Sequence, residues 1–294
     1  MTAPGRRIAL ASCDPFPPVP DDEEPLRAAL RSRGVAVEEP AWDARTDWRR
    51  FAACLVRTTW DYMERREEYL EWARRVATQT RIFHPPRVIA WTTHKSYLRA
   101  LEAAGVPLAP SVWLERGASV DLAALLRDRD WESALVKPMV GATARRTLRF
   151  GRADVTSGQA QLDAWLAEED MIVQQYLPAV ETEGELSVVM VDGQITHGVR
   201  KIPIPGDYRV QDDFGARDEP WPIDARCRLL ARDIATAAQG ILRTDLLYAR
   251  VDFLRDLEGD LVLNELELVE PQLFFRHEPS AGDRLAEALL ARLD

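Results

Sequence analysis

The chain has 294 residues, of which 46% are hydrophobic and 29% charged, as expected of a globular protein with a sizeable core. Its 38 basic residues against 48 acidic residues give a net charge of −10, which excludes a broad nucleic-acid-binding face because phosphate backbones need a basic surface. Three scattered cysteines, and no apolar run near the roughly 18 residues of a membrane helix, predict a reduced, cytoplasmic protein without a membrane partner.

The first section of the chain is predicted to alternate between strands and helices. Apolar runs and amphipathic stretches predict strands at 7–12, 35–37 and 53–56, and helices at 23–33 and 64–77. Such alternation is typical of an α/β unit with a parallel sheet. Pro85 and Pro86 cannot continue either kind of element, so the first domain is expected to cover residues 1–86.

A second section of strands and helices follows this boundary. The sequence predicts helices at 93–104, 122–129 and 162–168, and strands at 111–114, 134–137 and 171–177. Pro178 ends the last of these strands, so a second domain is expected over residues 87–177.

The third section, residues 178–294, is predicted to contain two β-hairpins. Asp192-Gly193 lies between alternating apolar runs, which is a strong hairpin signal. The sequence predicts strand pairs at 186–191 with 195–199 and at 248–254 with 261–266, helices at 224–239 and 283–292, and a long mobile loop at 202–222, where prolines gather.

The second hairpin carries the clearest chemical signal. Alternation along a strand puts Glu265 and Glu267 on one face, and antiparallel pairing can place Asp252 beside them. Three carboxylates on one face repel one another unless a cation neutralises them, and oxygen-only ligands favour Mg²⁺ or Mn²⁺ over zinc. The alternative is a solvated acidic sheet face. We favour a metal site, because the intervening leucines predict a buried opposite face that fixes the strand.

A lysine at the end of a predicted strand gives a second signal. Lys137 is followed by the small residues 141–144, which resembles a phosphate cradle made of a lysine charge and backbone N–H groups. A surface lysine before an ordinary β-turn explains the pattern equally well. Lys95, near the start of a predicted helix, is a weaker candidate, since a lone lysine there is usually solvated.

Taken in order, the chemistry-bearing residues resemble the ATP-grasp fold, and within it the glutathione synthetase-like carboxylate–amine ligases. The residues that carry the resemblance are Lys95, Lys137, Gln174-Gln175-Tyr176-Leu177-Pro178, Glu185, Arg250-x-Asp252, Glu265-x-Glu267 and Pro271. The resemblance covers about residues 82–294. It implies an α/β fold with a Rossmann-like N-terminal domain and two mixed α+β lobes of an ATP-grasp module.

The resemblance also implies a role for each matched residue. Lys95 and Lys137 would contact the ATP phosphates, and the hinge strand would meet adenine through the backbone of Gln174, Gln175, Tyr176 and Leu177. Glu185 would hold the ribose hydroxyls, although the spacing from the hinge leaves Glu181 and Glu183 open as alternatives.

The remaining matched residues would form the catalytic and metal-binding parts. Asp252, Glu265 and Glu267 would bind Mg²⁺, Arg250 would lie near the transferred phosphoryl group, Arg200 and Lys201 would face the phosphates, and the loop at 202–217 would close over the substrate. The chain departs from the family in two places. Many relatives have Asn at the position of Glu267, and the loop after Lys137 has fewer glycines than usual.

Two short segments carry a narrower resemblance. Residues 57–62, Arg-Thr-Thr-Trp-Asp-Tyr, and residues 265–271, Glu-Leu-Glu-Leu-Val-Glu-Pro, are similar to stand-alone ligases of the O-ureido-D-serine cyclo-ligase type, which close the ring of cycloserine. Arg57 would suit a substrate carboxylate, which a guanidinium binds with two hydrogen bonds. Arg57 and Asp61 could equally form a structural ion pair.

The family implies a reaction through an acyl phosphate that releases ADP and phosphate and forms an amide bond. We expect a small, amino-acid-like substrate, and the formation of a homodimer is left open. The alternative is a nucleotide-binding regulatory module that has lost its chemistry, which the departure at Glu267 would allow.

Overall fold

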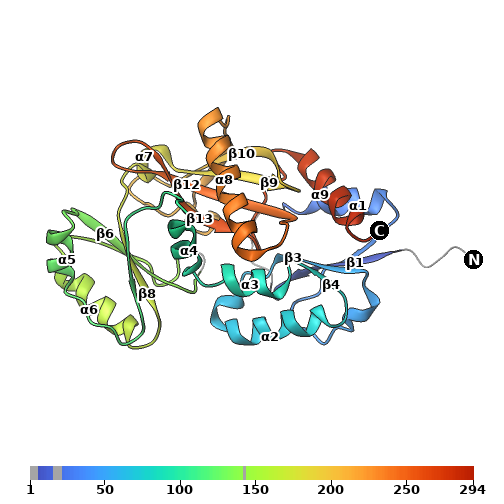
Figure 1. Ribbon diagram of the computed structural model, residues 1–294, viewed down its shortest axis with the longest axis horizontal. Coiled ribbons are helices and arrows are strands. Elements are labelled where there is room, and N and C mark those ends of the chain that lie inside the picture. The colour runs from blue at the N-terminus through green and yellow to red at the C-terminus, as the bar shows by residue number, and fades with distance from the viewer. Residues whose placement is uncertain (1–5, 16–21, 142–143) are drawn as a thin grey trace, which may run out of the picture.

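The structure is a computed structural model, and it describes residues 6–15, 22–141 and 144–294. Three separate sheets organise the chain, each built from one of its three successive sections. Figure 1 shows the middle sheet with its helices at one end of an elongated molecule, and the other two sheets close together at the opposite end. No described helix is both long and apolar enough to cross a membrane.

The first sheet is parallel, as the alternation of strands and helices predicts. Its order is β2-β1-β3-β4, with strands β1 (Arg7–Ser12), β2 (Ala36–Glu38), β3 (Ala53–Thr58) and β4 (Arg81–Phe83). Helices α1 (Glu24–Ser32) and α2 (Arg66–Ala77) pack on this sheet through apolar stripes. Four aromatic rings, those of Trp42, Trp48, Tyr69 and Trp72, pack edge to face or stacked under α2.

The middle sheet is antiparallel in the order β5-β8-β6-β7. Its strands are β5 (Ser111–Leu114), β6 (Ser133–Pro138), β7 (Leu148–Gly151) and β8 (Met171–Gln175), and helices α5 (Leu122–Asp128) and α6 (Val155–Leu166) cover one face. Helix α6 begins seven residues before its predicted start at 162. Gly158 lies within it and packs so closely on the Phe150 ring that a Cβ would come within 2.8 Å.

The third sheet has the order β11-β10-β9-β12-β13. It contains the two predicted hairpins, β9 (Glu185–Val191) with β10 (Gln194–Ile202) and β12 (Tyr248–Arg255) with β13 (Leu261–Glu267), and the edge strand β11 (Arg217–Pro220). The last strand corrects the expectation of an unbroken loop at 202–222. Because β11 lies at the sheet edge, it needs no apolar alternation and tolerates a proline.

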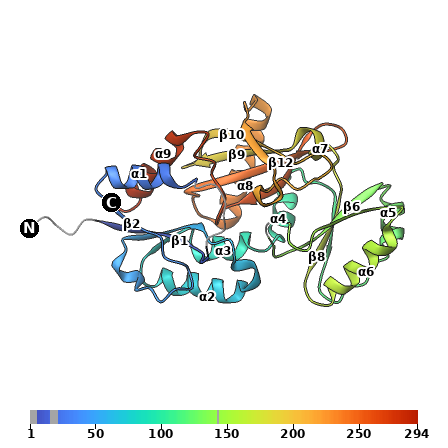
Figure 2. The ribbon, with the colours of Figure 1, turned by 180° about the vertical axis from the view of Figure 1, so that it is seen from behind.

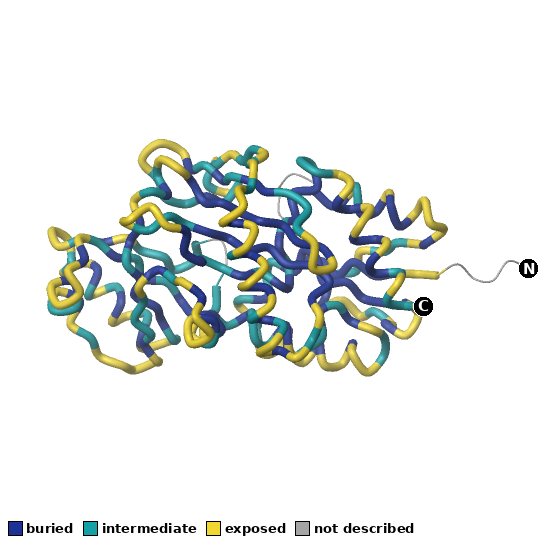
Figure 3. Tube along the Cα trace, turned by 45° about the horizontal axis from the view of Figure 1, so that its top comes forward, coloured by how far each residue is buried: buried dark blue, intermediate teal, exposed yellow. Residues whose placement is uncertain are grey.

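Helices join the third sheet to the first. Helix α8 (Ala225–Leu242) packs on one face of the third sheet, and α9 (Pro279–Ala291) packs against α1 of the first section, so one apolar core spans both. Figure 2 shows α1 and α9 side by side near the C-terminus. In Figure 3 the buried trace follows the strands, and the exposed trace follows the outer helices and turns.

Short helices complete the structure between the sheets. They are α3 (Pro86–Thr92), α4 (Tyr97–Ala103) and α7 (Val180–Glu183), with 3₁₀ turns at Trp48–Arg50, Tyr62–Glu64 and Asp212–Phe214. The predicted helix at 93–104 therefore starts four residues late, and α3 occupies the region expected to be a boundary. Cys13, Cys54 and Cys227 are buried free thiols.

Candidate active site

Two adjoining cavities lie against the third sheet. The first, with a volume of about 130 Å³, lies between the middle and third sheets and is lined by every residue expected to bind nucleotide: Lys95, Lys137, Gln174, Gln175, Tyr176, Leu177 and Glu185. The second, of about 390 Å³, lies between the third sheet and residues of the first section, and is lined by Lys201, Arg250, Asp252, Glu265 and Glu267. Glu185, Asn264 and Glu265 line both cavities, so the two are continuous.

Strand pairing brings the predicted acidic residues together. In the antiparallel pair β12–β13, Asp252 lies opposite Glu265 and Arg250 lies opposite Glu267, so these four side chains share one face. The alternate residues, such as Leu266, are buried in the core beneath. This confirms the expected register of the hairpin and the buried opposite face that holds it.

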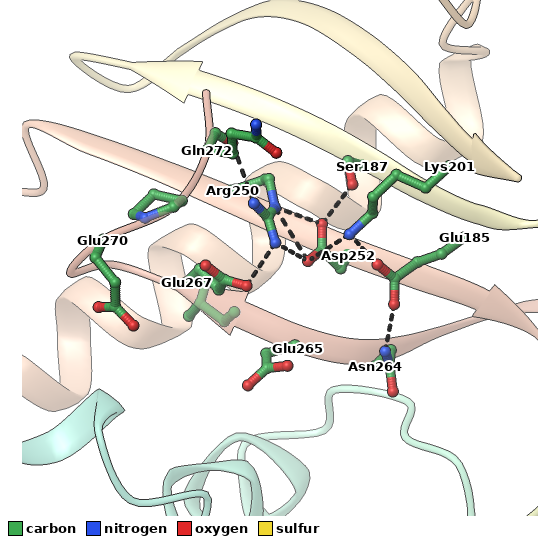
Figure 4. Close-up of polar contacts among 12 residues, drawn as sticks. Glu185, Ser187, Lys201, Arg250, Asp252, Asn264, Glu265, Glu267, Glu270 and Gln272 are labelled. Atoms are coloured by element: carbon green, nitrogen blue, oxygen red, sulfur yellow. Dashed lines mark hydrogen bonds and ion pairs between the residues drawn. The ribbon is translucent and has the colours of Figure 1, made fainter. Parts of the chain in front are cut away.

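Two cations of the chain hold the carboxylates of the second cavity (Figure 4). Arg250 donates through Nε and Nη2 to Asp252, at 2.9 and 2.8 Å, and through Nη2 to Glu267 at 2.5 Å. Lys201 pairs with Glu185 and lies 3.4 Å from Asp252. Because each guanidinium or ammonium bridges two acids, the cluster is cross-linked rather than a row of separate pairs.

The charges of these acids depend on how well each is compensated. Burial disfavours ionisation of Asp252, but Arg250 and Lys201 outweigh it and lower its pKa to about 2. Burial raises the pKa of Glu267 to about 7, and Asp252 and Glu265 add to the rise despite the single contact with Arg250. Glu267 is therefore less well compensated by neighbouring positive charge than Asp252.

The two lysines of the nucleotide cavity differ in their partners. Lys95 pairs with Glu265 and donates to the Gly141 carbonyl at 3.1 Å, and although burial opposes its charge, Glu265 raises its pKa. Lys137 has no ion-pair partner among the described residues. Burial, and then the nearby Lys95, lower its pKa to about 8. An unpaired cation in this cavity fits a phosphate group, and the small residues 142–143 of the predicted cradle lie outside the described residues.

One acid among the three ribose candidates lines the nucleotide cavity. Glu185 does so, and it also accepts a hydrogen bond from Asn264 Nδ2. Glu181 instead binds Arg149 and the Tyr176 hydroxyl, and Glu183 binds Arg255 on the surface.

The structure places three predicted site residues outside both cavities. Arg57 is 1% exposed and is bound by Glu23 at 2.7 Å, Asp61 accepts from Trp42 Nε1 at 2.7 Å and pairs with Arg65, and Arg200 pairs with Glu219. The packing around Arg57 and Asp61 favours the structural alternative over direct substrate contact. Arg57 lies on the fully buried strand β3, whose side chains face the interior of the protein.

The second cavity also contains residues that sequence reasoning missed. Trp60, Tyr62 and Glu270 line it, and Glu270 is a carboxylate whose pKa burial raises to about 8, with Glu267 and Glu265 adding to the rise. Glu270 was overlooked because β13 ends at Glu267, so the two-residue alternation that marks Glu265 and Glu267 stops before it.

Composition holds a further signal that the sequence analysis did not use. The chain contains three lysines, Lys95, Lys137 and Lys201, and all other strongly basic residues are arginines. All three lysines line the cavities. The lysine ammonium group is a compact charge that can bind phosphate. The location of all three lysines in the two cavities therefore indicates where phosphate would bind.

The acidic cluster has the donor chemistry of a magnesium site. Among the described side chains, no group of three or more acids, histidines or cysteines is arranged so that it could bind a metal ion. Arg250 and Lys95 instead occupy the carboxylate oxygens that an ion would use. Asp252, Glu265 and Glu267 offer oxygen atoms alone, which fits a hard divalent cation such as Mg²⁺.

Comparison with known proteins identifies the family. Residues 8–84 match the family model described as "D-cycloserine synthetase DcsG, N-terminal domain", and residues 121–257 match "Prokaryotic glutathione synthetase, ATP-grasp domain". The cycloserine biosynthesis protein DcsG of Streptomyces lavendulae is 31% identical over 290 residues, which cover 94% of this chain and 95% of that protein. The chain belongs to the ATP-grasp ligases.

Solved structures extend the likeness to the whole of this ATP-grasp ligase. The crystal structure of D-cycloserine synthetase DcsG matches with a TM-score of 0.88 and 28% identity, covering 98% of this chain and 100% of that one. D-alanine–D-alanine ligase from Bacillus anthracis, complexed with ATP, matches with a TM-score of 0.69 and 14% identity, covering 98% and 97% of the chains, and shows the shared fold. The chain is an ATP-dependent ligase, of a fold that uses ATP and a divalent metal ion.

Proposed function

We propose that this ligase activates a carboxylate as an acyl phosphate, releasing ADP, and then joins it to a nitrogen with release of phosphate. The observation that supports this proposal is the continuity of the two cavities, since the nucleotide and acidic groups line one space. The described residues that line the two cavities supply cations and carboxylates but include no histidine, cysteine or serine, so positioning and charge stabilisation would carry the chemistry.

The residues of the site suggest how this chemistry is divided. Lys137 and Lys95 would bind the nucleotide phosphates, and Glu185 would bind ribose beside the hinge. A divalent ion, Mg²⁺ or Mn²⁺, held by Asp252, Glu265 and Glu267, would neutralise charge on the phosphate oxygens. Arg250, held by Asp252 and by the Gln272 carbonyl, would keep its guanidinium directed at the transferred phosphoryl group.

We propose O-ureido-D-serine as the substrate and cycloserine as the product. The likeness of the N-terminal section, residues 8–84, to that of D-cycloserine synthetase supports this choice, since the ATP-grasp lobes are shared with many other ligases. The nitrogen bound to oxygen would attack the acyl phosphate, forming the ring C–N bond, losing its proton and releasing phosphate. Cycloserine has no carbamoyl group, so water must also release that group as carbon dioxide and ammonia.

Nucleotide analysis and mass spectrometry with O-ureido-D-serine as the single added acid test this proposal. We expect ADP, phosphate and a cyclic product without an external amine. AMP and pyrophosphate would refute the acyl-phosphate route. ADP formed only with an added amine would keep the ligase chemistry and reject cyclisation.

Replacing Lys137 should weaken nucleotide binding. We expect Lys137→Ala to reduce the affinity for ATP by about 10- to 100-fold, because a hydrogen bond to a charged group contributes roughly 1.5–3 kcal/mol. Calorimetric titration with ATP checks this, and Arg226→Ala, which removes one cation from the surface, is the matched control. Equal affinity of wild type and Lys137→Ala would remove Lys137 from the site.

The lowered pKa of Lys137 also predicts a pH dependence. In the free enzyme its ammonium is mostly charged at pH 7 and mostly neutral at pH 9, because its pKa is about 8. The dissociation constant for ATP should therefore rise by about tenfold between these pH values. In Lys137→Ala the same interval should leave the constant nearly flat, and a parallel rise in both proteins would assign the effect to another group.

A further inference from the structure

Glu270 differs from the other acids of the second cavity in its partners. It lines the cavity with Trp60 and Tyr62. None of the described lysines, arginines or histidines forms an ion pair with it. In Figure 4 no dashed contact joins Glu270 to the cluster around Arg250, whereas Glu267 is drawn in contact with Arg250.

Side-chain hydrogen bonds hold the backbone on both sides of Glu270. We call residues 268–272 the anchored segment, because each of its carbonyl oxygens accepts a hydrogen bond from a side chain. The donors, in order along the segment, are His84, Tyr248 at 2.7 Å, Trp60 at 2.8 Å, Arg57 at 2.9 Å and Arg250 at 3.1 Å. In regular secondary structure, backbone carbonyls are bound by backbone N–H groups. It is unusual for five consecutive carbonyls to be bound by side chains instead.

These donors come from distant parts of the chain. Arg57 and Trp60 belong to β3 and the loop after it, and His84 follows β4, so the first section holds a segment that follows the last strand of the third sheet. His84 donates through Nδ1 and accepts from the Leu247 amide at Nε2, which fixes its tautomer. These hydrogen bonds hold the backbone of the anchored segment at the wall of the cavity that Glu270 lines.

The charge around Glu270 is incomplete. Asp252 and Glu267 share Arg250, Glu265 pairs with Lys95, and Glu185 pairs with Lys201, whereas the half-buried Glu270 has no ion pair among the described residues. A carboxylate that lines a cavity near other acids is repelled by them, so this position favours a cation from a ligand. The aromatic walls of Trp60 and Tyr62 suit an organic ammonium better than a hydrated metal ion.

We propose that Glu270 binds the α-ammonium group of the amino-acid substrate and so selects α-amino acids over acids that lack this group. This inference rests on the proposed function, in which Arg250 faces the phosphoryl group that is transferred to the substrate carboxylate. Arg250 and Glu270 line the same cavity of about 390 Å³, which is the size of a small-ligand site. Arg57 is a positioning residue for Glu270 rather than a substrate contact, and Trp60 both holds the Glu270 carbonyl and lines the cavity.

The test compares O-ureido-D-serine with its des-amino counterpart, 3-(ureidooxy)propanoic acid, in the presence of a non-hydrolysable ATP analogue and Mg²⁺. Calorimetry should show that the wild type binds the amino compound about 10- to 100-fold more tightly. In Glu270→Gln this preference should disappear, and the des-amino compound should bind at least as well as it does to the wild type. Glu258→Gln, in an exposed turn, removes the same charge elsewhere and should keep the preference.

A merely structural role for Glu270 would give a different pattern from a role in binding the substrate. If Glu270 binds the substrate, Glu270→Gln should leave the midpoint of thermal unfolding unchanged or higher, because no cation of the protein loses a partner. Loss of affinity for both compounds in equal measure, or an undiminished preference in Glu270→Gln, would overturn the assignment. If the wild type binds neither compound and releases no ADP with O-ureido-D-serine, the proposed function is at fault and this inference falls with it.

Discussion

Asp252→Asn is expected to lower kcat/KM by about 10²–10³-fold, because it removes a proposed ligand of the metal ion and the counter-charge that holds Arg250 and Lys201 in the site. Asp252 is 1% exposed, accepts from Ser187 at 2.6 Å and compensates both Arg250 and Lys201. An amide of the same shape cannot neutralise either cation. The variant should also lose about 3–5 kcal/mol in the free energy of unfolding, since a buried ion pair loses one partner.

Steady-state ADP release at saturating Mg²⁺, with urea unfolding of the same preparations, separates the two effects. Asp260→Asn, in the exposed turn of the same hairpin, is the matched control and should match the wild type in turnover. Wild-type turnover in Asp252→Asn would remove this residue from the proposed metal and phosphoryl site. Loss of stability without loss of activity in the folded fraction would assign it to structure alone.

Arg57→Met is expected to cost about 3–5 kcal/mol of folding free energy. The side chain is buried, donates twice to Glu23 at 3.0 and 2.7 Å, and also holds the Pro271 carbonyl. Although burial opposes its charge, Glu23 raises its pKa further, so it stays charged at every accessible pH. Methionine fills the volume but leaves the Glu23 carboxylate and the carbonyl without this donor.

The double variant Arg57→Met/Glu23→Gln should recover part of this stability, because it leaves no uncompensated buried charge. Urea unfolding of the single and double variants measures the coupling between the two residues. A direct substrate role for Arg57 predicts the opposite pattern, with unchanged unfolding and a raised KM for the acid. That outcome would return Arg57 to the list of substrate contacts.

Much of the site could be predicted because its residues lie on regular strands. The hairpin over β12 and β13 has apolar residues on one face and acids on the other, so alternation alone places Asp252, Glu265 and Glu267 together. The nucleotide residues were assigned from family resemblance, and the cavity they line gathers them from two sheets. Their roles remain predictions that the variants above test.

Other parts of the structure leave no periodic trace in the sequence. The sequence analysis misses the first turns of helix α6 because Gly158 is typical of a helix break. The close packing of Gly158 on the Phe150 ring explains why a glycine lies inside this helix. Strand β11 consists of charged residues and a proline, which an edge position permits. Arg57 and Glu270 depend on side-chain hydrogen bonds between segments more than 200 residues apart, which no local pattern encodes.

The confinement of lysine to the two cavities has a chemical consequence. Arginine supplies the positive charge of the surface, and guanidinium groups do not react with reagents that acylate or alkylate primary amines. Such reagents, and enzymes that acetylate lysine, find side-chain targets in this protein at Lys95, Lys137 and Lys201 alone. Since Lys137 is the least basic of them, half of it is a free amine near pH 8. Among side chains, amine-directed labelling or immobilisation therefore acts on the ligase site itself, and a bound nucleotide would shield it.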